Sequence, residues 1–189
     1  MNVRDILAFA TEKHAGQLRK DKTTPYINHP IDVCEMLFET GITEKPFTDT
    51  NLNEQDYIYY STALAHDLLE DTGVTEEALS EVLSPELSRR VLTLTFRAEE
   101  NNPFGKALYL SRIANNDDDV VFFVKCADRI CNVRDFLSEG LFKYAKIYFH
   151  KADALWGSLY HRQPLREQMW KEVLTLNETL KGKGHGKKA

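Results

Sequence analysis

Long hydrophobic runs are missing from this sequence. The longest, such as "VVFFV" at 120–124, is far shorter than the roughly 20 residues that a membrane-spanning helix needs. Residues 1–14 also lack the pattern of a secretory signal peptide, because Asp5 and Glu12 interrupt the apolar positions and no small-residue cleavage site follows. We therefore expect a protein that does not insert into a membrane.

Cysteine is scarce, and an excess of basic residues is absent. The three cysteines, Cys34, Cys126 and Cys131, match no disulfide, metal-ligand or redox spacing, which favours buried free thiols in a reducing cytoplasm. With 29 acidic and 24 basic residues the net charge is −5, which argues against binding to a nucleic-acid polymer. The sequence does not determine the oligomeric state.

The chain has the length and composition of one globular domain. Its 189 residues, 42% hydrophobic and 28% charged, suffice for a single well-buried core. Apolar positions recur with helical spacing, and neither a repeat nor an interior linker interrupts them. We predict one all-α domain over residues 1–181, a helical bundle, followed by a disordered basic tail at 182–189. The predicted helices cover residues 3–15, 30–40 (with Pro30 first), 53–71, two short segments capped by Thr75 and Ser84, 103–116, 117–136 (starting from the acidic "DDD"), 139–160 and 164–181.

The segment "TALAHDLLED" at 62–71 carries an unusual density of ionisable side chains. On a continuous helix with His66 at 0°, Asp67 would lie near ~100°, Glu70 near ~40° and Asp71 near ~140°. The four polar groups would then share one face, and the leucines between them would pack on the other. This arrangement suits metal or acid–base chemistry, but a solvated face near a helix end would look the same.

Two further residues extend this pattern. His29 closes the loop "PYINHP", and Asp128 lies in "KCADRICN" directly after the most hydrophobic run. Each has an ordinary explanation taken alone, as a histidine at a helix entry or as an aspartate paired with Arg129. Together with His66 and Asp67 they give the order H…HD…D, whose imidazole and carboxylate donors suit a divalent ion such as Mn²⁺, Fe²⁺ or Zn²⁺.

Four motifs carry a resemblance to a known family: "HAGQLRK" at 14–20, "PYINHP" at 25–30, "ALAHDLLEDTGVT" at 63–75 and "KCADRICNVRD" at 125–135. With them the chain resembles the HD-domain metal-dependent phosphohydrolases, and among these the alarmone hydrolases of the RelA/SpoT type. It is most similar to the small single-domain members, such as the metazoan SpoT homologue. The resemblance implies an HD-type helical bundle and a hydrolase without a synthetase domain.

The resemblance also implies roles for individual residues. The metal ligands, for a single Mn²⁺ per chain, would be His29, His66, Asp67 and Asp128. Glu70 and Asp71 would orient and activate the attacking water, Arg19 and Lys20 would hold the nucleotide base and its phosphates, and Asn132 would line the nucleoside pocket. A polyanionic substrate also needs cations beside the acidic metal site, and Lys22, Lys125 and Arg129 are further candidates. For Lys125 and Arg129, a structural ion pair with neighbouring carboxylates is an equally open interpretation.

The predicted activity is Mn²⁺-dependent removal of the 3′ pyrophosphate from guanosine tetra- or pentaphosphate (ppGpp or pppGpp), giving GDP or GTP. The basic loop "RKDKTTPY" lacks the Ser-Gly of many family members, Cys131 replaces a histidine, and Asp135 replaces a threonine that often contacts the nucleoside. These departures leave open another nucleotide substrate, such as an adenosine alarmone or a deoxynucleotide phosphate. A non-catalytic nucleotide-binding module is the third alternative. Tyr26 and His14 are expected to be packing residues.

Overall fold

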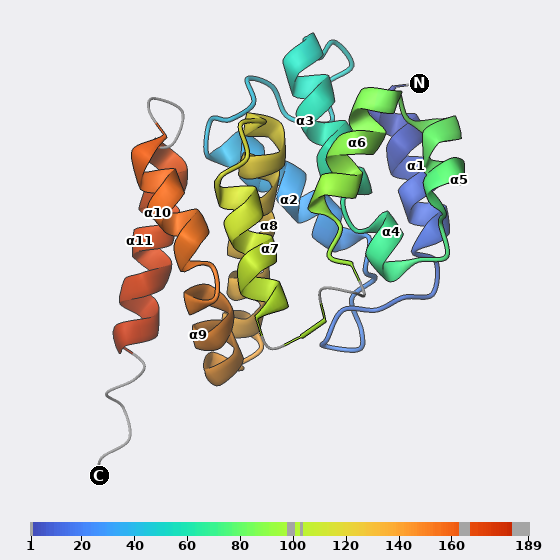
Figure 1. The fold of residues 1–189 in the computed structure, drawn as a ribbon. Coiled ribbons are helices and arrows are strands. Elements are labelled where there is room, and N and C mark those ends of the chain that lie inside the picture. Colours follow the sequence, from blue (N-terminus) through green and yellow to red (C-terminus); the bar gives the residue numbers. More distant parts are fainter. Residues whose placement is uncertain (1, 98–100, 103, 163–166, 183–189) are drawn as a thin grey trace.

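The computed structural model describes residues 2–97, 101–102, 104–162 and 167–182. These residues form the predicted all-α fold, and within them the only extended pairing is one bridge between Leu18 and Pro25 (Figure 1). The helices are α1 (Val3–Lys13), α2 (Asn28–Glu39), α3 (Glu54–Ala65), α4 (Leu68–Asp71), α5 (Glu76–Val82), α6 (Pro85–Leu94), α7 (Gly105–Ala114), α8 (Asp119–Ser138), α9 (Phe142–His150), α10 (Asp153–His161) and α11 (Glu167–Gly182). In the part of the chain so described, no helix is long and apolar enough to cross a membrane.

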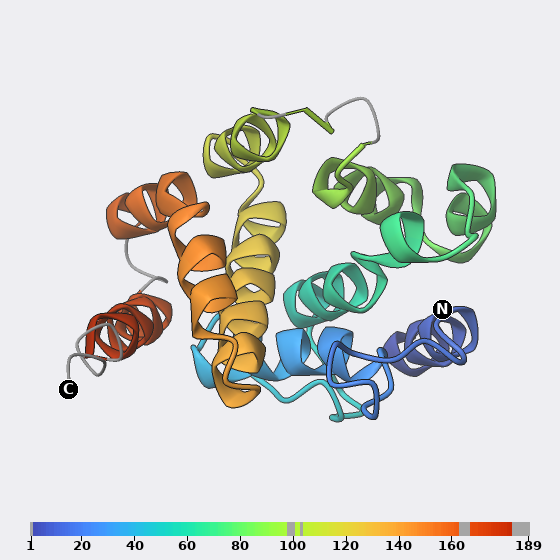
Figure 2. The ribbon, with the colours of Figure 1, turned by 90° about the horizontal axis from the view of Figure 1, so that it is seen from below.

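Helix α8 is the central element of the bundle. It contacts α2, α3 and α6 on one side and α9, α10 and α11 on the other, and α7 packs along it as well (Figures 1 and 2). The β-branched and aromatic residues of its first half are buried, and Asp118 caps its start by accepting hydrogen bonds from the amides of Val120 and Val121. The prediction of a buried helix with an acidic start is confirmed. Side chains that point from α8 therefore reach several helices at once.

The predicted helix signals are correct at several ends and wrong at others. Thr75 and Ser84 cap α5 and α6 through the amides three residues ahead, as expected. The prediction that Pro30 begins a helix is wrong, because α2 starts two residues earlier at Asn28. Proline is tolerated there since the amides of the first turn need no partner within the helix. Pro103, predicted to begin the helix over 103–116, lies outside the described residues, and α7 starts at Gly105.

A continuous helix over 53–71 is the most consequential wrong prediction. Helix α3 ends at Ala65, and α4 begins at Leu68. The Nδ1 atom of His66 donates to the carbonyl of Ala63 at 2.6 Å. In an uninterrupted helix that carbonyl would accept the amide of Asp67. The imidazole therefore competes for the helical hydrogen bond, and the chain turns at the His-Asp pair itself.

The predicted helix over 139–160 is likewise divided. Helix α9 ends at His150 and α10 begins at Asp153. The indole of Trp156 donates to the carbonyl of Phe149 at 2.9 Å, which satisfies a backbone group at the end of α9. At the C-terminus, α11 extends through Gly182, one residue into the predicted tail, and residues 183–189 lie outside the described part.

The buried surface joins these helices into one core. Its largest fully buried side chains come from α1 through α8, and all three cysteines are free and buried, as predicted. Trp156 is also buried. This core fixes the relative positions of α2, α3 and α8, the three helices on which the H…HD…D residues depend.

Candidate metal centre and its surroundings

Three of the four predicted ligands meet in the buried interior. His29 lies in the first turn of α2, His66 follows the last residue of α3, and Asp128 lies in the middle of α8. One ligand atom from each lies within 4.8 Å of those of the other two. The contacts between α2, α3 and α8 therefore bring together residues that are 37 to 99 positions apart in the sequence.

The two imidazoles present nitrogen atoms toward the aspartate. Nε2 of His29 lies 3.1 Å and Nε2 of His66 lies 3.8 Å from Oδ1 of Asp128. Because Nδ1 of His66 donates to Ala63, its Nε2 is free to act as an acceptor, and this buried atom has no hydrogen-bond partner among the described residues. A buried nitrogen held in this way is the usual geometry of a histidine that binds a metal.

Asp67, the fourth predicted ligand, lies at the edge of this group. Its Oδ2 atom is 3.1 Å from Nε2 of His66 and 3.6 Å from Nε2 of His29, and it accepts the hydroxyl hydrogen of Tyr26 at 2.7 Å. The carboxylate therefore borders both imidazoles. It adds a second negative charge to the centre.

The electrostatics of the centre favour a cation. Burial opposes protonation of His66, but the charges of Asp67 and Asp128 beside the ring outweigh it and raise the pKa of the imidazole to about 10. Burial also opposes ionisation of Asp128, yet Lys125 and both imidazoles hold the pKa of its carboxyl well below the ordinary value. The field that favours a proton on His66 would equally favour a divalent ion. The nitrogen and oxygen donors fit Mn²⁺, Fe²⁺ or Zn²⁺.

Glu70 and Asp71 leave the centre in different directions, contrary to the prediction that they share one face with His66 and Asp67. An oxygen of Asp71 lies 2.5 Å from the Tyr26 hydroxyl, which also contacts Asp67. Glu70 accepts a hydrogen bond from the backbone amide of Phe96, in the segment that follows α6. Both residues are exposed, in contrast to the ligands beneath them. The interruption after Ala65 accounts for this divergence.

Lys125 and Arg129 differ in whether a carboxylate pairs with their charge. Nζ of Lys125 lies 2.8 Å from Oδ2 of Asp128 within the buried interior, so the structural ion pair exists. Arg129 makes no such pair with the residues that the structure describes. Its guanidinium is fully buried 3.9 Å from the ring centre of Tyr148, and within the described chain its nitrogen atoms have no hydrogen-bond partner.

Asn132, Arg19 and Lys20 lie on the outer side of Asp128. The Asn132 amide donates to Oδ1 of Asp128 at 2.5 Å, and its oxygen lies 3.4 Å from Nη2 of Arg19. The Arg19 guanidinium is paired with Asp135 and lies 5.5 Å from the ring centre of Tyr26. Nζ of Lys20 lies 3.9 Å from the ring centre of Phe136. Asn132 thus connects the inner ligands to the predicted base-binding loop, and no contact between Lys22 and these groups is present in the described residues.

Two residues were missed or underrated in the sequence. Tyr26 is more than the expected packing residue, because its hydroxyl contacts both Asp67 and Asp71. Lys106 on α7 belongs to no recognised motif, yet it lies close enough to Lys125 that burial and the charge of Lys125 lower its pKa to about 8. Only the position of Tyr26 inside "PYINHP" could have hinted at its role. His14 is a packed residue as predicted, stacked on Tyr26 with ring centres 4.7 Å apart.

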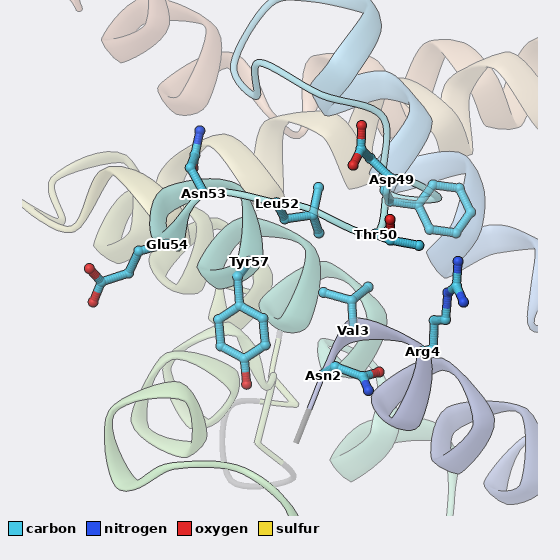
Figure 3. Close-up of a pocket in the computed structure, with 10 residues that line it drawn as sticks. Asn2, Val3, Arg4, Asp49, Thr50, Leu52, Asn53, Glu54 and Tyr57 are labelled. Atoms are coloured by element: carbon cyan, nitrogen blue, oxygen red, sulfur yellow. The ribbon is translucent and has the colours of Figure 1, made fainter.

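A cavity of about 520 Å³ lies elsewhere on the molecule (Figure 3). It is formed between the start of α1 and the beginning of α3, with Val3, Leu52 and Tyr57 in its wall. Helix α3 separates it from His66 by roughly 18 Å, the length of a 12-residue helix. None of the predicted site residues line it.

The bundle and its centre define the class. Paired imidazoles and aspartates supplied by "H…HD…D" at the junction of three helices are the mark of an HD-type hydrolase, the class that the motifs predict. No protein-family model matches the chain.

Individual relatives place it more narrowly. The chain is 36% identical over 138 residues to guanosine-3′,5′-bis(diphosphate) 3′-pyrophosphohydrolase MESH1 of Danio rerio, covering 69% of this chain and 67% of that protein. It is 33% identical to MESH1 of Homo sapiens, with 67% and 65% covered. A probable GTP pyrophosphokinase of Mycobacterium leprae is 34% identical over 70% of this chain, which is 15% of that protein. The chain therefore belongs to the RelA/SpoT-type alarmone hydrolase family that includes MESH1.

A solved structure confirms the fold. A metazoan orthologue of SpoT, described as hydrolysing ppGpp, superimposes with a TM-score of 0.76 over 94% of both chains, at 21% sequence identity. The predicted HD-type helical bundle is thus confirmed over nearly the whole chain.

Proposed function

We propose that this protein is a metal-dependent 3′-pyrophosphohydrolase of ppGpp and pppGpp, with one Mn²⁺ per chain and no synthetase activity. In this reaction water forms a bond to the phosphorus attached to the 3′ oxygen, the bond to that oxygen breaks, and pyrophosphate leaves GDP or GTP behind. The observation that carries the proposal is the buried grouping of His29, His66 and Asp128 within 4.8 Å, in a chain of the family that includes MESH1.

The four predicted ligands would hold the ion. His29, His66 and Asp128 supply the atoms that already converge, and Asp67 adds a carboxylate beside both imidazoles. When bound, a divalent ion supplies Lewis-acid chemistry, activating water near neutral pH and polarising a phosphoryl oxygen. The hydrogen bonds that Ala63 and Asn132 make to His66 and Asp128 fix the orientation of these two ligands.

Glu70 and Asp71 are the proposed proton-handling groups. Desolvation by the surrounding protein raises the pKa of Glu70, although Lys125 and the amide of Phe96 oppose it, and the carboxylate becomes a stronger base. Asp71 is held beside Asp67 by the Tyr26 hydroxyl. One carboxylate can take the proton of the attacking water while the other orients it.

The substrate would lie across the outer side of the centre. We assign Arg19 and Lys20 to the nucleotide base and its surroundings, and Asn132 to the nucleoside, following the family resemblance. On the inner side Lys125 and Arg129 provide positive potential, and Lys106, which is only partly buried, provides a cation that phosphate oxygens can approach. The free, buried cysteines are consistent with action in a reducing cytoplasm.

The test is turnover of the purified protein with ppGpp, with and without Mn²⁺, followed by separation of the products. Metal-dependent release of GDP and intact pyrophosphate is the expected result. Asp67→Ala is the inactive control, and Asp153→Asn, an exposed acidic residue on α10, is the control for lost charge. Release of orthophosphate would contradict the proposed reaction. Turnover of an adenosine or deoxynucleotide analogue in place of ppGpp would favour a phosphohydrolase with another nucleotide substrate. Binding of ppGpp without turnover would favour a non-catalytic nucleotide-binding module.

A further inference from the structure

Arg19 and Asp135 form an ion pair between two segments that are 116 residues apart. Arg19 belongs to the connection between α1 and α2, and Asp135 lies near the end of α8. The guanidinium donates through Nη2 to Oδ2 of Asp135, and the side chains are 13% and 33% exposed. The pair therefore lies at the outer edge of the site, where it is partly shielded from water.

Both partners are held by local structure. The amide of Arg19 donates to the carbonyl of Thr24 at 2.7 Å, and Asp21 accepts from the amides of Thr23 and Thr24, so the basic loop closes on itself. On α8, Asp135 follows Asn132 by three residues. Side chains three and four apart lie on one face of a helix, so Asp135 projects on the same side as Asn132.

The pairing changes what Arg19 can bind. Burial would lower the pKa of the Arg19 guanidinium, but its hydrogen bond to Asp135 and the charge of that carboxylate prevail and raise it. A phosphate would have to displace a carboxylate that is already bonded. The guanidinium also lies over the Tyr26 ring, and a planar, paired guanidinium suits stacking on an aromatic base.

The inner cations present the opposite situation. Arg129 has no hydrogen-bond partner in the described part of the chain, and Lys106 has its pKa lowered to about 8 by burial and by the charge of Lys125. The inner side of the centre therefore carries the positive charges of Arg129 and Lys106, which Glu70 and Asp128 offset in part. Phosphate groups are better accommodated there than at Arg19.

We propose that Asp135 is a positioning residue that sets specificity, because it holds Arg19 as a stacking surface for the base and withholds that charge from phosphate. The inference rests on the proposed function, since it assigns the two ends of the same nucleotide substrate. It predicts that the base and the phosphates are recognised by separable groups: Arg19 and Asp135 at one end, Lys106 at the other.

The experiment measures binding of two fragments by calorimetry, guanosine for the base and inorganic pyrophosphate for the phosphates. Asp135→Asn keeps the shape and removes the charge. We expect Asp135→Asn to weaken guanosine binding about tenfold, the factor of one charge-assisted hydrogen bond, while pyrophosphate binds equally or more tightly. Lys106→Met should weaken pyrophosphate binding and leave guanosine binding unchanged. Asp117→Asn, an exposed residue just before α8, is the matched control and should change neither.

A second variant keeps the test independent of folding. Arg19→Lys retains a positive charge for Asp135 but loses the guanidinium plane, so guanosine binding should fall while pyrophosphate binding stays. With ppGpp as substrate, Asp135→Asn should raise KM and leave kcat unchanged, whereas general misfolding would lower kcat as well. The inference would be overturned if Asp135→Asn weakened the binding of both fragments equally or changed the binding of neither. It would also be overturned if guanosine did not bind to the unmodified chain. Because these fragments bind without turnover, that result is separate from a failure to hydrolyse ppGpp.

Discussion

The hydroxyl of Tyr26 lies 2.7 Å from Oδ2 of Asp67, a residue 41 positions further along the chain. The same hydroxyl lies 2.5 Å from Oδ2 of Asp71. Burial first, and then the charges of the two aspartates, raise the pKa of Tyr26. The phenol therefore keeps its proton and donates a hydrogen bond to the carboxylates. One hydroxyl thereby connects a predicted metal ligand to a residue predicted to handle the attacking water.

Tyr26→Phe removes this connection while keeping the ring that stacks on His14. A hydrogen bond to a charged group contributes about 1.5–3 kcal/mol, so we expect kcat to fall roughly ten- to a hundredfold with the metal retained. Steady-state kinetics together with metal analysis of the purified variant measures this. Tyr57→Phe, in the cavity wall at the far end of α3, is the control. An unchanged kcat would remove Tyr26 from the mechanism.

Asp67→Ala should abolish turnover and lower the bound metal at the same time. Its carboxylate supplies one of the two aspartate charges at the centre, and removing it leaves the imidazoles with Asp128 alone. Elemental analysis after dialysis against a limiting Mn²⁺ concentration measures the metal, and the ppGpp assay measures turnover. Full metal content with full activity would exclude Asp67 as a ligand.

Glu70→Gln should separate metal binding from proton transfer. The amide keeps the size of the side chain but cannot accept a proton from water, so kcat should fall by about 10²-fold or more. Bound metal should remain, because Glu70 lies outside the group of converging ligand atoms. Glu76→Gln, exposed in the first turn of α5, is the matched control. Retained turnover would assign the proton to Asp71 instead.

The contribution of Lys106 should depend on pH. Its pKa of about 8 reflects burial and the charges of Lys125 and Arg129, opposed by Glu70 and Asp128. The side chain is charged below that pH and loses its charge as the pH rises through it. At about pH 7 we expect Lys106→Met to raise KM roughly tenfold, and above about pH 9 the difference from the unmodified chain should largely disappear. A ratio of KM values that is constant with pH would contradict this.

Metal binding should stabilise the fold measurably. The ligands come from α2, α8 and the junction after α3, so an ion bound among them links the elements of the core. At a free concentration about a hundredfold above Kd, the free energy of unfolding should increase by roughly 2.7 kcal/mol. Thermal unfolding with Mn²⁺, with a chelator and with Ca²⁺ tests this, and Ca²⁺, which prefers oxygen ligands, should have less effect. Equal unfolding temperatures in all three would contradict it.

Much of the fold could be predicted from local patterns. The caps at Thr75 and Ser84 and the buried helix around "VVFFV" with its acidic start follow from short-range chemistry, and each was found where the sequence placed it. The break after Ala65 could not be found in this way. It depends on an imidazole that takes a backbone carbonyl, and apolar periodicity contains no sign of that exchange.

The centre itself shows the same division. The order H…HD…D identified residues that meet, because motif and chemistry agree there. Lys106 was missed because its role comes only from the packing of α7 beside α8, and a lone lysine in a helix has no distinguishing spacing. The pairing of Arg19 with Asp135 joins residues too far apart in sequence for any local rule to connect.

Helix α8 is uninterrupted and carries Lys125, Asp128, Asn132 and Asp135. The spacing and rotation of these four side chains relative to one another are therefore fixed by a single helix. A residue inserted between Asn132 and Asp135 would rotate Asp135 by about 100° and separate it from Arg19, while the ligand at Asp128 stayed in place. An insertion before Lys125 would instead displace the whole series relative to α2 and α3. Changes of length in this helix thus act on substrate choice or on metal binding according to where they fall, even when no functional side chain is replaced.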